Sequence, residues 1–253
     1  DVYSLSSNIV QPIITPRFAI SCSSKLMTGL VSLATKYELG IQTHLSENTQ
    51  EIEIVKDLHS SLSYTDVYKE HGLLSVKGPV IMAHAIHLSE YEKQTLIKHK
   101  TGIAHCPCSN LYLQSGRFNL SSWLNDYSKI GLGTDISGGI STSLFSEMRS
   151  AYQTHLNLKL TPQNSCPDKT TNLNVNNLFY CATLGGASVL RLDDKIGNFK
   201  LGKAFDANII SLKNTGPNSV IETYSTDDIL QKLVFVADSR DILSTYVQGI
   251  RIS

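Results

Sequence analysis

The sequence contains no long apolar run, no excess of charge of either sign and no charged-then-apolar leader. A membrane-spanning helix needs roughly 18 consecutive apolar residues, and no segment of this chain approaches that length. Lys and Arg together number 22, as do Asp and Glu. Because nucleic acids and anionic membranes attract basic surfaces, this balance disfavours both as partners.

Cysteines are few and odd in number. The five are Cys22, Cys106, Cys108, Cys166 and Cys181. A chain of 253 residues, of which 41% are hydrophobic, is long and apolar enough to form a core without disulfide bonds. We therefore predict reduced thiols in an intracellular, cytosolic protein with one large domain or two unequal ones.

Apolar segments alternate with helical patterns through the first 160 residues. The predicted strands cover residues 8–15, 41–46, 80–84, 103–106 and 130–132. The predicted helices cover residues 26–37, 51–58, 64–71, 89–98, 120–127 and 144–156, and residues 107–119 and 157–174 are expected to be loops. Strand-then-helix units in a row favour an α/β fold with a parallel sheet and helices outside it.

The pattern changes in the last third of the chain. Residues 175–190 predict a further helix, with Gly185-Gly186 as a weak point inside it. Turn glycines and strand-like alternation follow Arg191, and residues 233–237 and 243–252 read as strands. This predicts a first domain at residues 1–190 and a small β appendage at residues 191–253.

Residue types that bind divalent metals lie at the ends of three predicted strands. His44 ends one strand with Glu47 three positions later, His84 ends the next, and Asp135 follows the strand at 130–132. The carboxyl ends of parallel strands lie at one edge of a sheet, so these side chains are expected to gather there. Imidazoles and carboxylates suit zinc, and a nearby carboxylate can move protons to and from a water.

Each of these residues has a simpler interpretation when taken alone. An isolated His-x-x-Glu is more often a core histidine beside a capping or surface glutamate, and an isolated Thr-Asp is more often a helix cap. Three such strand ends together make coincidence the weaker explanation. His87, the second histidine of a His-x-x-His, is expected in the loop after the strand rather than at the site.

The segment Cys106-Pro107-Cys108 also has two interpretations. It resembles part of the zinc motif of cytidine-type deaminases, but that motif needs His-x-Glu and Pro-Cys-x-x-Cys, and neither is present. We therefore interpret these cysteines as buried or loop thiols. His105 and Asn110 beside them are weaker candidates for ligand contact.

Short motifs follow one another along nearly the whole chain. They are Thr15-Pro16-Arg17-Phe18, Gln42-Thr43-His44-Leu45-Ser46-Glu47-Asn48, Met82-Ala83-His84, Ala104-His105-Cys106-Pro107-Cys108-Ser109-Asn110-Leu111, Gly131-Leu132-Gly133-Thr134-Asp135-Ile136-Ser137-Gly138-Gly139, Ala182-Thr183-Leu184-Gly185-Gly186-Ala187 and Ile196-Gly197-Asn198-Phe199-Lys200-Leu201-Gly202-Lys203-Ala204-Phe205-Asp206-Ala207. In this order they resemble the carboxyl-terminal part of the guanine deaminases, a family within the amidohydrolase superfamily. Thr-Pro-Arg-Phe and the Gly-Gly after Thr-Asp are the more particular of these motifs.

The resemblance implies a TIM-type (β/α)8 barrel of the metal-dependent hydrolase type. Residues 1–190 would supply strands four to eight of the barrel, and residues 191–253 would supply the C-terminal part of a small β-sandwich. The resemblance also implies one zinc ion per active site, held by His44 and Asp135. A small purine substrate and a homodimer belong to the same expectation.

The resemblance further implies a role for each site residue. Glu47, His84 and Asp135 would be catalytic, with Glu47 as the proton shuttle and the other two orienting the attacking water. Arg17 and Phe18 would bind the purine, together with His44, Glu47 and Asp135. The implied reaction is the zinc-dependent hydrolytic deamination of guanine to xanthine and ammonia, a step of purine catabolism.

The chain departs from the family at one motif. The family's first zinc ligands form a His-x-His pair on the first barrel strand, and none of the eight histidines of this chain forms one. Residue 1 is Asp, and the opening residues resemble a helix–loop connection. We therefore expect a processed product or fragment of a longer enzyme, which binds little zinc and has no activity by itself. The alternatives are another amidohydrolase acting on an amino- or chloro-heterocycle, and a non-catalytic truncated isoform or binding protein.

Overall fold

The computed structural model describes residues 9–60, 62–161, 172–211 and 224–253. The chain divides into two compact units, Asp1–His105 and Cys106–Ser253. The domain boundary that the sequence pattern predicts after residue 190 stays a prediction. Within the described ranges, no helix combines the length and the apolar character that a membrane span requires.

The first unit is built on parallel strands. They are β1 (Ile13–Ile14), β2 (Gly40–Leu45), β3 (Val80–His84) and β4 (Gly102–His105), hydrogen-bonded in that order. The predicted α/β class is therefore confirmed. β1 is shorter than the predicted strand at residues 8–15, because Pro12 has no N–H to donate to a strand ladder. Asn8 lies outside the described residues.

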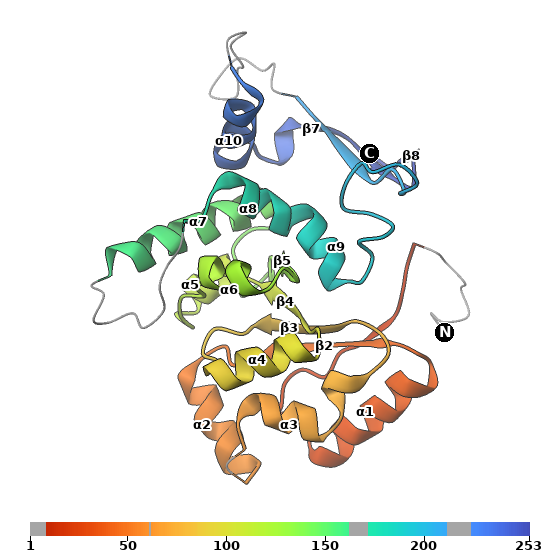
Figure 1. Ribbon diagram of the computed structural model, residues 1–253, viewed down its shortest axis with the longest axis vertical. Coiled ribbons are helices and arrows are strands. Elements are labelled where there is room, and N and C mark those ends of the chain that lie inside the picture. Colours follow the sequence, from red (N-terminus) through yellow and green to blue (C-terminus); the bar gives the residue numbers. More distant parts are fainter. Residues whose placement is uncertain (1–8, 61, 162–171, 212–223) are drawn as a thin grey trace. The chain divides into compact units, whose positions relative to one another are not determined.

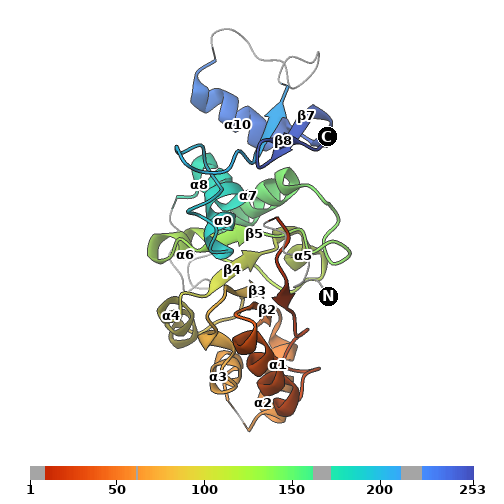
Figure 2. The same ribbon diagram turned by 90° about the vertical axis from the view of Figure 1, so that its right-hand side faces the viewer.

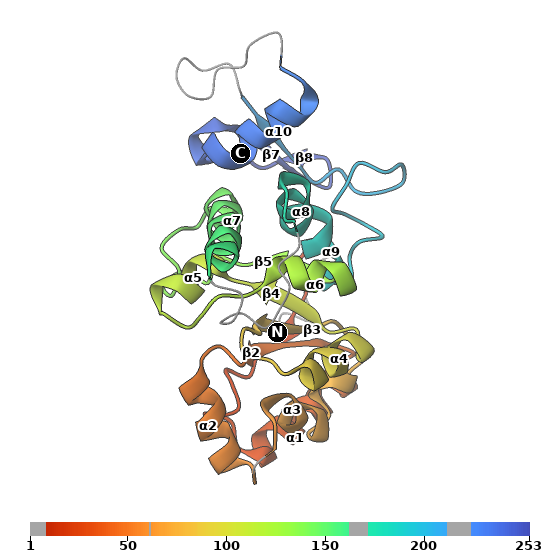
Figure 3. The ribbon, with the colours of Figure 1, turned by 60° about the vertical axis from the view of Figure 1, so that its left-hand side comes forward.

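Helices follow the strands of this unit in sequence. They are α1 (Ser24–Lys36), α2 (Thr49–Leu58), α3 (Tyr64–Glu70) and α4 (Glu90–Lys98), with the 3-10 turn η2 (Leu73–Ser75) after α3. Figures 1, 2 and 3 show all four helices on the same side of β2 and β3. The core takes fully buried apolar side chains from both layers, among them Met27, Ile41, Leu45, Val55, Met82 and Leu96.

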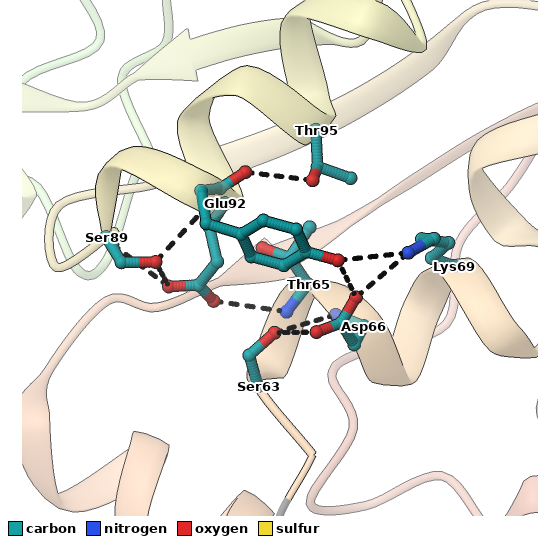
Figure 4. Close-up of polar contacts among 8 residues, drawn as sticks. Ser63, Thr65, Asp66, Lys69, Ser89, Glu92 and Thr95 are labelled. Atoms are coloured by element: carbon teal, nitrogen blue, oxygen red, sulfur yellow. Dashed lines mark hydrogen bonds and ion pairs between the residues drawn. The ribbon is translucent and has the colours of Figure 1, made fainter.

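Polar side chains join the beginnings of α3 and α4 (Figure 4). Glu92 completes a capping box, because its Oε2 accepts the Ser89 N–H at 3.0 Å. Its Oε1 accepts the N–H of Thr65 at 3.4 Å. Beside them, Lys69 donates to Asp66 at 3.2 Å. These bonds explain how Glu92 can be 7% exposed, since both of its carboxylate oxygens have donors.

The second unit begins with α5 (Pro107–Tyr112) and α6 (Leu120–Asp126), which lead to the short strand β5 (Ile130–Leu132) and the long helix α7 (Leu144–Leu160). The loop predicted at residues 107–119 is wrong in its first half. Proline suits the first turn of a helix, where its missing N–H has no intrahelical partner, and Pro107 begins α5 there. The loop predicted at residues 157–174 begins later than expected because α7 continues to Leu160; residues 162–171 lie outside the described ranges.

The helix predicted at residues 175–190 is present as three consecutive helical segments. They are α8 (Val175–Tyr180), the π-helical η4 (Cys181–Gly185) and α9 (Gly186–Val189). The expected weak point coincides with the end of the π segment. A Cβ at Gly185 would lie 2.4 Å from the carbonyl oxygen of Ile130, so a glycine is needed for this close approach to β5.

The last part of this unit is a small antiparallel sheet with one helix. β6 (Ala207–Ile210), β7 (Ile242–Val247) and β8 (Ile250–Arg251) are hydrogen-bonded in that order, and the 3-10 turn η5 (Ser239–Asp241) precedes β7. The strand predicted at residues 243–252 is confirmed as the hairpin β7–β8. Its assignment to a β-sandwich stays a prediction.

The strand predicted at residues 233–237 is wrong, because these residues end the helix α10 (Thr226–Val236). Ser225 and Asp228 form a capping box at its start. Helix α10 packs on α7 and α8 (Figure 3). Arg149 of α7 stabilises its other end by donating to the carbonyls of Val234 and Ala237 at 3.3 and 3.0 Å.

Candidate active site

His44 lies at the end of β2 with one ring nitrogen fixed by backbone. Its Nδ1 donates to the carbonyl of Arg17 at 2.5 Å, and its backbone N–H approaches the same oxygen at 3.4 Å. A carbonyl can only accept, so the proton sits on Nδ1 and the lone pair on Nε2. Metal-binding histidines are oriented by this type of contact, with the second nitrogen directed at the ion.

His84 reaches His44 through an irregular backbone at the end of β3. The parallel register pairs His44 with Ala83 and Leu45 with His84. Regular alternation would therefore put His84 on the face opposite to His44. His84 has a φ of 68°, which ends the extended run, and its ring stacks on that of His44 with centroids 5.4 Å apart. The sequence predicted that His84 ends a strand, but it did not predict the left-handed backbone at this residue.

Glu47 lies beside this pair of rings. Its Oε2 is 3.8 Å from Nε2 of His84. Its backbone N–H donates to the carboxylate of Glu51 at 3.2 Å, and that carboxylate also accepts the hydroxyl of Tyr64 at 2.6 Å. Glu51 is 4% exposed. The sequence predicted a helix over residues 51–58, but it did not indicate that the Glu51 side chain holds Glu47.

Arg17 and Phe18 follow β1 and approach the same imidazole. The Arg17 guanidinium carbon lies 5.3 Å from the centroid of the Phe18 ring. The Phe18 ring meets the His44 ring edge-on, with centroids 6.2 Å apart. Arg17 is exposed and Phe18 half-buried, so both can contact a ligand. The first unit therefore brings together five of the six predicted site residues.

Asp135, the sixth predicted site residue, belongs to the second unit and follows β5. Its Oδ2 accepts the hydroxyl of Ser109 at 2.6 Å. The N–H groups of Gly138 and Gly139 donate to its backbone carbonyl at 2.9 and 2.6 Å. A Cβ at Gly138 would lie 2.7 Å from Oδ2 of Asp135 and 2.8 Å from the Ser109 hydroxyl, so only glycine fits beside this pair.

The two proposed metal ligands therefore lie in separate compact units. Across the part of the chain that the structure describes, no group of three or more His, Cys, Asp or Glu residues could hold a metal ion. The donor chemistry nevertheless fits zinc: His44 offers a lone pair on Nε2, and Ser109 orients the carboxylate of Asp135. Both side chains are thus of the types that bind zinc in proteins.

The remaining candidates are buried. His105 is 1% exposed, and burial, with a smaller effect of His84, lowers the pKa of its imidazole to about 3. Burial raises the pKa of the Cys108 thiol to about 11 and that of Cys181 to about 12. None of the thiols of Cys22, Cys106, Cys108 and Cys181 forms a disulfide bond. The interpretation of Cys106 and Cys108 as buried thiols is confirmed, while Cys166 lies outside the described residues.

Comparisons with known proteins extend over nearly all of the chain. A model of the amidohydrolase family matches residues 4–251. A probable guanine deaminase of Schizosaccharomyces pombe is 42% identical over 245 residues, which are 95% of this chain and 45% of that protein. The guanine deaminase of Dictyostelium discoideum is 41% identical over 246 residues, which are 96% of this chain and 53% of that protein.

A solved structure is also similar to nearly the whole chain. A guanine deaminase from C. acetobutylicum, crystallised with guanine bound in its active site, matches with a TM-score of 0.87 and 39% identity. The match covers 99% of this chain and 57% of the other. The chain therefore spans about half the length of the relatives and structures that it matches.

Proposed function

Because the chain belongs to the amidohydrolase family, we propose that it carries part of the active site of an enzyme that hydrolyses guanine to xanthine and ammonia. Relatives that bear the name guanine deaminase are about 40% identical to it. The observation that carries the proposal is the gathering of Arg17, Phe18, His44, Glu47 and His84 at the ends of neighbouring parallel strands.

Zinc is the metal that the donor set favours. His44, with its lone pair on Nε2, and Asp135, with its carboxylate oriented by Ser109, are the proposed ligands. When bound, a zinc ion lowers the pKa of a water to about 7 and makes hydroxide available at neutral pH. The second carboxylate of the site then remains available for proton transfer.

Glu47 is the proposed proton shuttle. Its carboxylate takes a proton from the attacking water and returns protons to a ring nitrogen and to the departing amine. In this hydrolysis the water oxygen forms a bond to the carbon that bears the amino group, the carbon–nitrogen bond breaks, and ammonia leaves. The 3.8 Å separation between Glu47 and His84 supports a shared role for them at the reacting carbon.

Arg17 is the proposed specificity residue. Its guanidinium can donate to the carbonyl oxygen of guanine, which adenine lacks. Adenine would leave this cation without its acceptor, and such losses discriminate strongly between substrates. Phe18, whose ring contacts both the guanidinium and His44, supplies an aromatic surface for the purine.

The proposal is tested with the longest protein from the gene that contains these 253 residues. The purified protein is assayed for ammonia release from guanine, adenine and cytosine. We expect turnover of guanine and none of adenine or cytosine. If guanine is inert while another amino-heterocycle is deaminated, the assignment to guanine is wrong.

Several features of the whole enzyme remain part of the proposal. They are a (β/α)8 barrel in which this chain supplies strands four to eight, a β-sandwich completed by both chain ends, a homodimer and a cytosolic location. The similarity to guanine deaminase structures supports the barrel. The other features rest on the resemblance to the family.

A further inference from the structure

A tyrosine hydroxyl on α3 joins the segment after β1 to the end of β2. Tyr68 is 1% exposed, and its hydroxyl donates to the carbonyl of His44 at 2.8 Å. The hydroxyl oxygen of Tyr68 also accepts the N–H of Ala19 at 3.1 Å. Ala19 directly follows Arg17 and Phe18, the residues that we expect to bind the purine. One buried hydroxyl therefore contacts the backbone on both sides of the candidate site.

Thr43 adds a second connection between the same two segments. Its hydroxyl donates to the carbonyl of Arg17 at 3.1 Å and lies 3.3 Å from the hydroxyl oxygen of Tyr68. The Arg17 carbonyl is also the acceptor for Nδ1 of His44. The atom that orients the imidazole thus belongs to the residue whose guanidinium is proposed to recognise the substrate.

We propose that Tyr68 is a positioning residue that fixes residues 17–19 against β2, so that purine recognition and orientation of the His44 imidazole depend on the same hydrogen bonds. A shift of the Arg17 backbone would move both its guanidinium and the carbonyl that holds His44. The purine, its recognition by Arg17 and the role of His44 as a zinc ligand rest on the proposed function. The mechanical link rests on the contacts of Tyr68 and Thr43.

If Tyr68 only packed its ring in the core, its hydroxyl group would have no role there. The Tyr68 ring contacts the ring of Tyr64 with centroids 5.3 Å apart, and this contact needs only the aromatic ring. The hydroxyl, in contrast, serves as donor to one backbone group and acceptor from another. Burial raises the pKa of Tyr68 to about 12, so the hydroxyl keeps its proton and remains a donor at neutral pH.

The test compares Tyr68→Phe and Thr43→Val with wild type in the longest protein that contains this chain. Both changes keep the shape of the side chain and remove the hydroxyl. Three quantities are measured: amide hydrogen exchange of the peptide that covers residues 16–22, the rate of zinc loss to a chelator, and KM and kcat for guanine. Since an unsatisfied buried hydrogen-bonding group is costly, we expect Tyr68→Phe to raise the exchange rate at Ala19, to speed zinc loss and to raise KM about tenfold.

Tyr180→Phe is the matched control. It removes a tyrosine hydroxyl that donates to the carbonyl of Ser128 at 2.9 Å in the second unit, whereas residues 17–19 belong to the first unit. We expect it to leave exchange at Ala19, zinc loss and KM at wild-type values. A Tyr68→Phe protein that behaves like this control, with only a lower unfolding temperature, would overturn the inference.

The outcomes also separate this inference from the proposed function. If wild type does not turn over guanine, the proposed function fails, and hydrogen exchange at Ala19 still decides whether Tyr68 fixes residues 17–19. If wild type is active but Tyr68→Phe leaves all three quantities unchanged, the proposed function stands and the positioning role is wrong. Thr43→Val tests the link separately. It removes the hydrogen bond from Thr43 to the Arg17 carbonyl and leaves the bond between Ala19 and Tyr68 in place.

Discussion

Glu47 combines an accessible carboxylate with a fixed backbone. Its N–H is held by the buried carboxylate of Glu51, and its side chain lies beside His84. Proton transfer by a positioned carboxylate contributes about 10²- to 10⁴-fold to the rate of such reactions. We predict that Glu47→Gln lowers kcat for guanine by about this factor while zinc content and guanine affinity are retained, as measured by steady-state kinetics, metal analysis and equilibrium binding.

Glu53→Gln is the control for this change. Glu53 has a 70% exposed side chain that pairs with Lys56 on the surface of α2, so its charge is not expected to affect the reaction. A near-wild-type kcat in the Glu47→Gln protein would show that Glu47 is not the proton shuttle. If kcat falls equally in Glu47→Gln and Glu53→Gln, the loss comes from the removal of a negative charge in general and not from Glu47 itself.

Gly138 is predicted to affect zinc binding, because it lies against Asp135, a proposed zinc ligand, and Ser109. An added methyl group would lie under 3 Å from Asp135 Oδ2 and the Ser109 hydroxyl, which now bond at 2.6 Å. We therefore expect Gly138→Ala to displace the carboxylate and to weaken zinc binding by about 10- to 100-fold, as measured by competition with a chelator. Gly29→Ala is the control, since a Cβ there meets nothing within 4 Å. Equal zinc affinity in both variants would contradict the prediction.

The sequence predicted candidate site residues but not how the backbone brings those of the first unit together. Strand ends that finish on His44, His84 and Asp135 could be recognised from apolar runs alone. The left-handed backbone at His84 could not, because no glycine or asparagine marks it. No sequence pattern indicates the roles of Tyr68 and Glu51, because each acts through backbone groups that are distant in sequence or belong to an irregular turn.

At the scale of the element, η4 packs closely against the backbone of β5 through Gly185. Gly185 lies where a Cβ would be 2.4 Å from the carbonyl of Ile130, whereas a Cβ at Gly186 would meet its nearest neighbour at an ordinary 3.5 Å. We predict that Gly185→Ala lowers the free energy of unfolding by about 1–3 kcal/mol, because backbone must shift to admit the methyl group. Chemical denaturation with urea measures this difference.

Gly186→Ala is the control one residue away. Alanine has a higher helix propensity than glycine, so this variant is expected to be neutral or more stable by up to about 1 kcal/mol. A Gly185→Ala protein as stable as Gly186→Ala would show that β5 and the π segment do not need their present distance. The weak point predicted at these glycines would then have no structural basis.

Local patterns predicted most elements, and the errors have identifiable causes. Residues 233–237 are all apolar and include two β-branched valines, which suggests a strand in a short window. The capping box at Ser225 and contacts with α7 and α8 make the segment a helix. Pro107 was interpreted as a loop residue, although proline is equally favourable in the first turn of a helix.

At the scale of the molecule, the candidate site residues are divided between the two compact units. Arg17, His44, Glu47 and His84 lie in the first unit and Asp135 in the second. The sequence contains no His-x-His pair, and the chain spans about half the length of its relatives. We predict that the 253-residue chain alone retains far less than one zinc per molecule after dialysis and does not deaminate guanine. One tightly held zinc together with turnover would contradict this.

The most direct test of the account is the fate of guanine in ¹⁸O-labelled water with the longest protein that contains this chain, in wild-type form and as Arg17→Met. Hydrolytic deamination inserts one water oxygen at the carbon that loses its amino group. We predict xanthine with one ¹⁸O atom and free ammonia from wild type, and at least tenfold lower kcat/KM from Arg17→Met with zinc content unchanged. Unchanged guanine in the wild-type reaction, or full activity without Arg17, would contradict it.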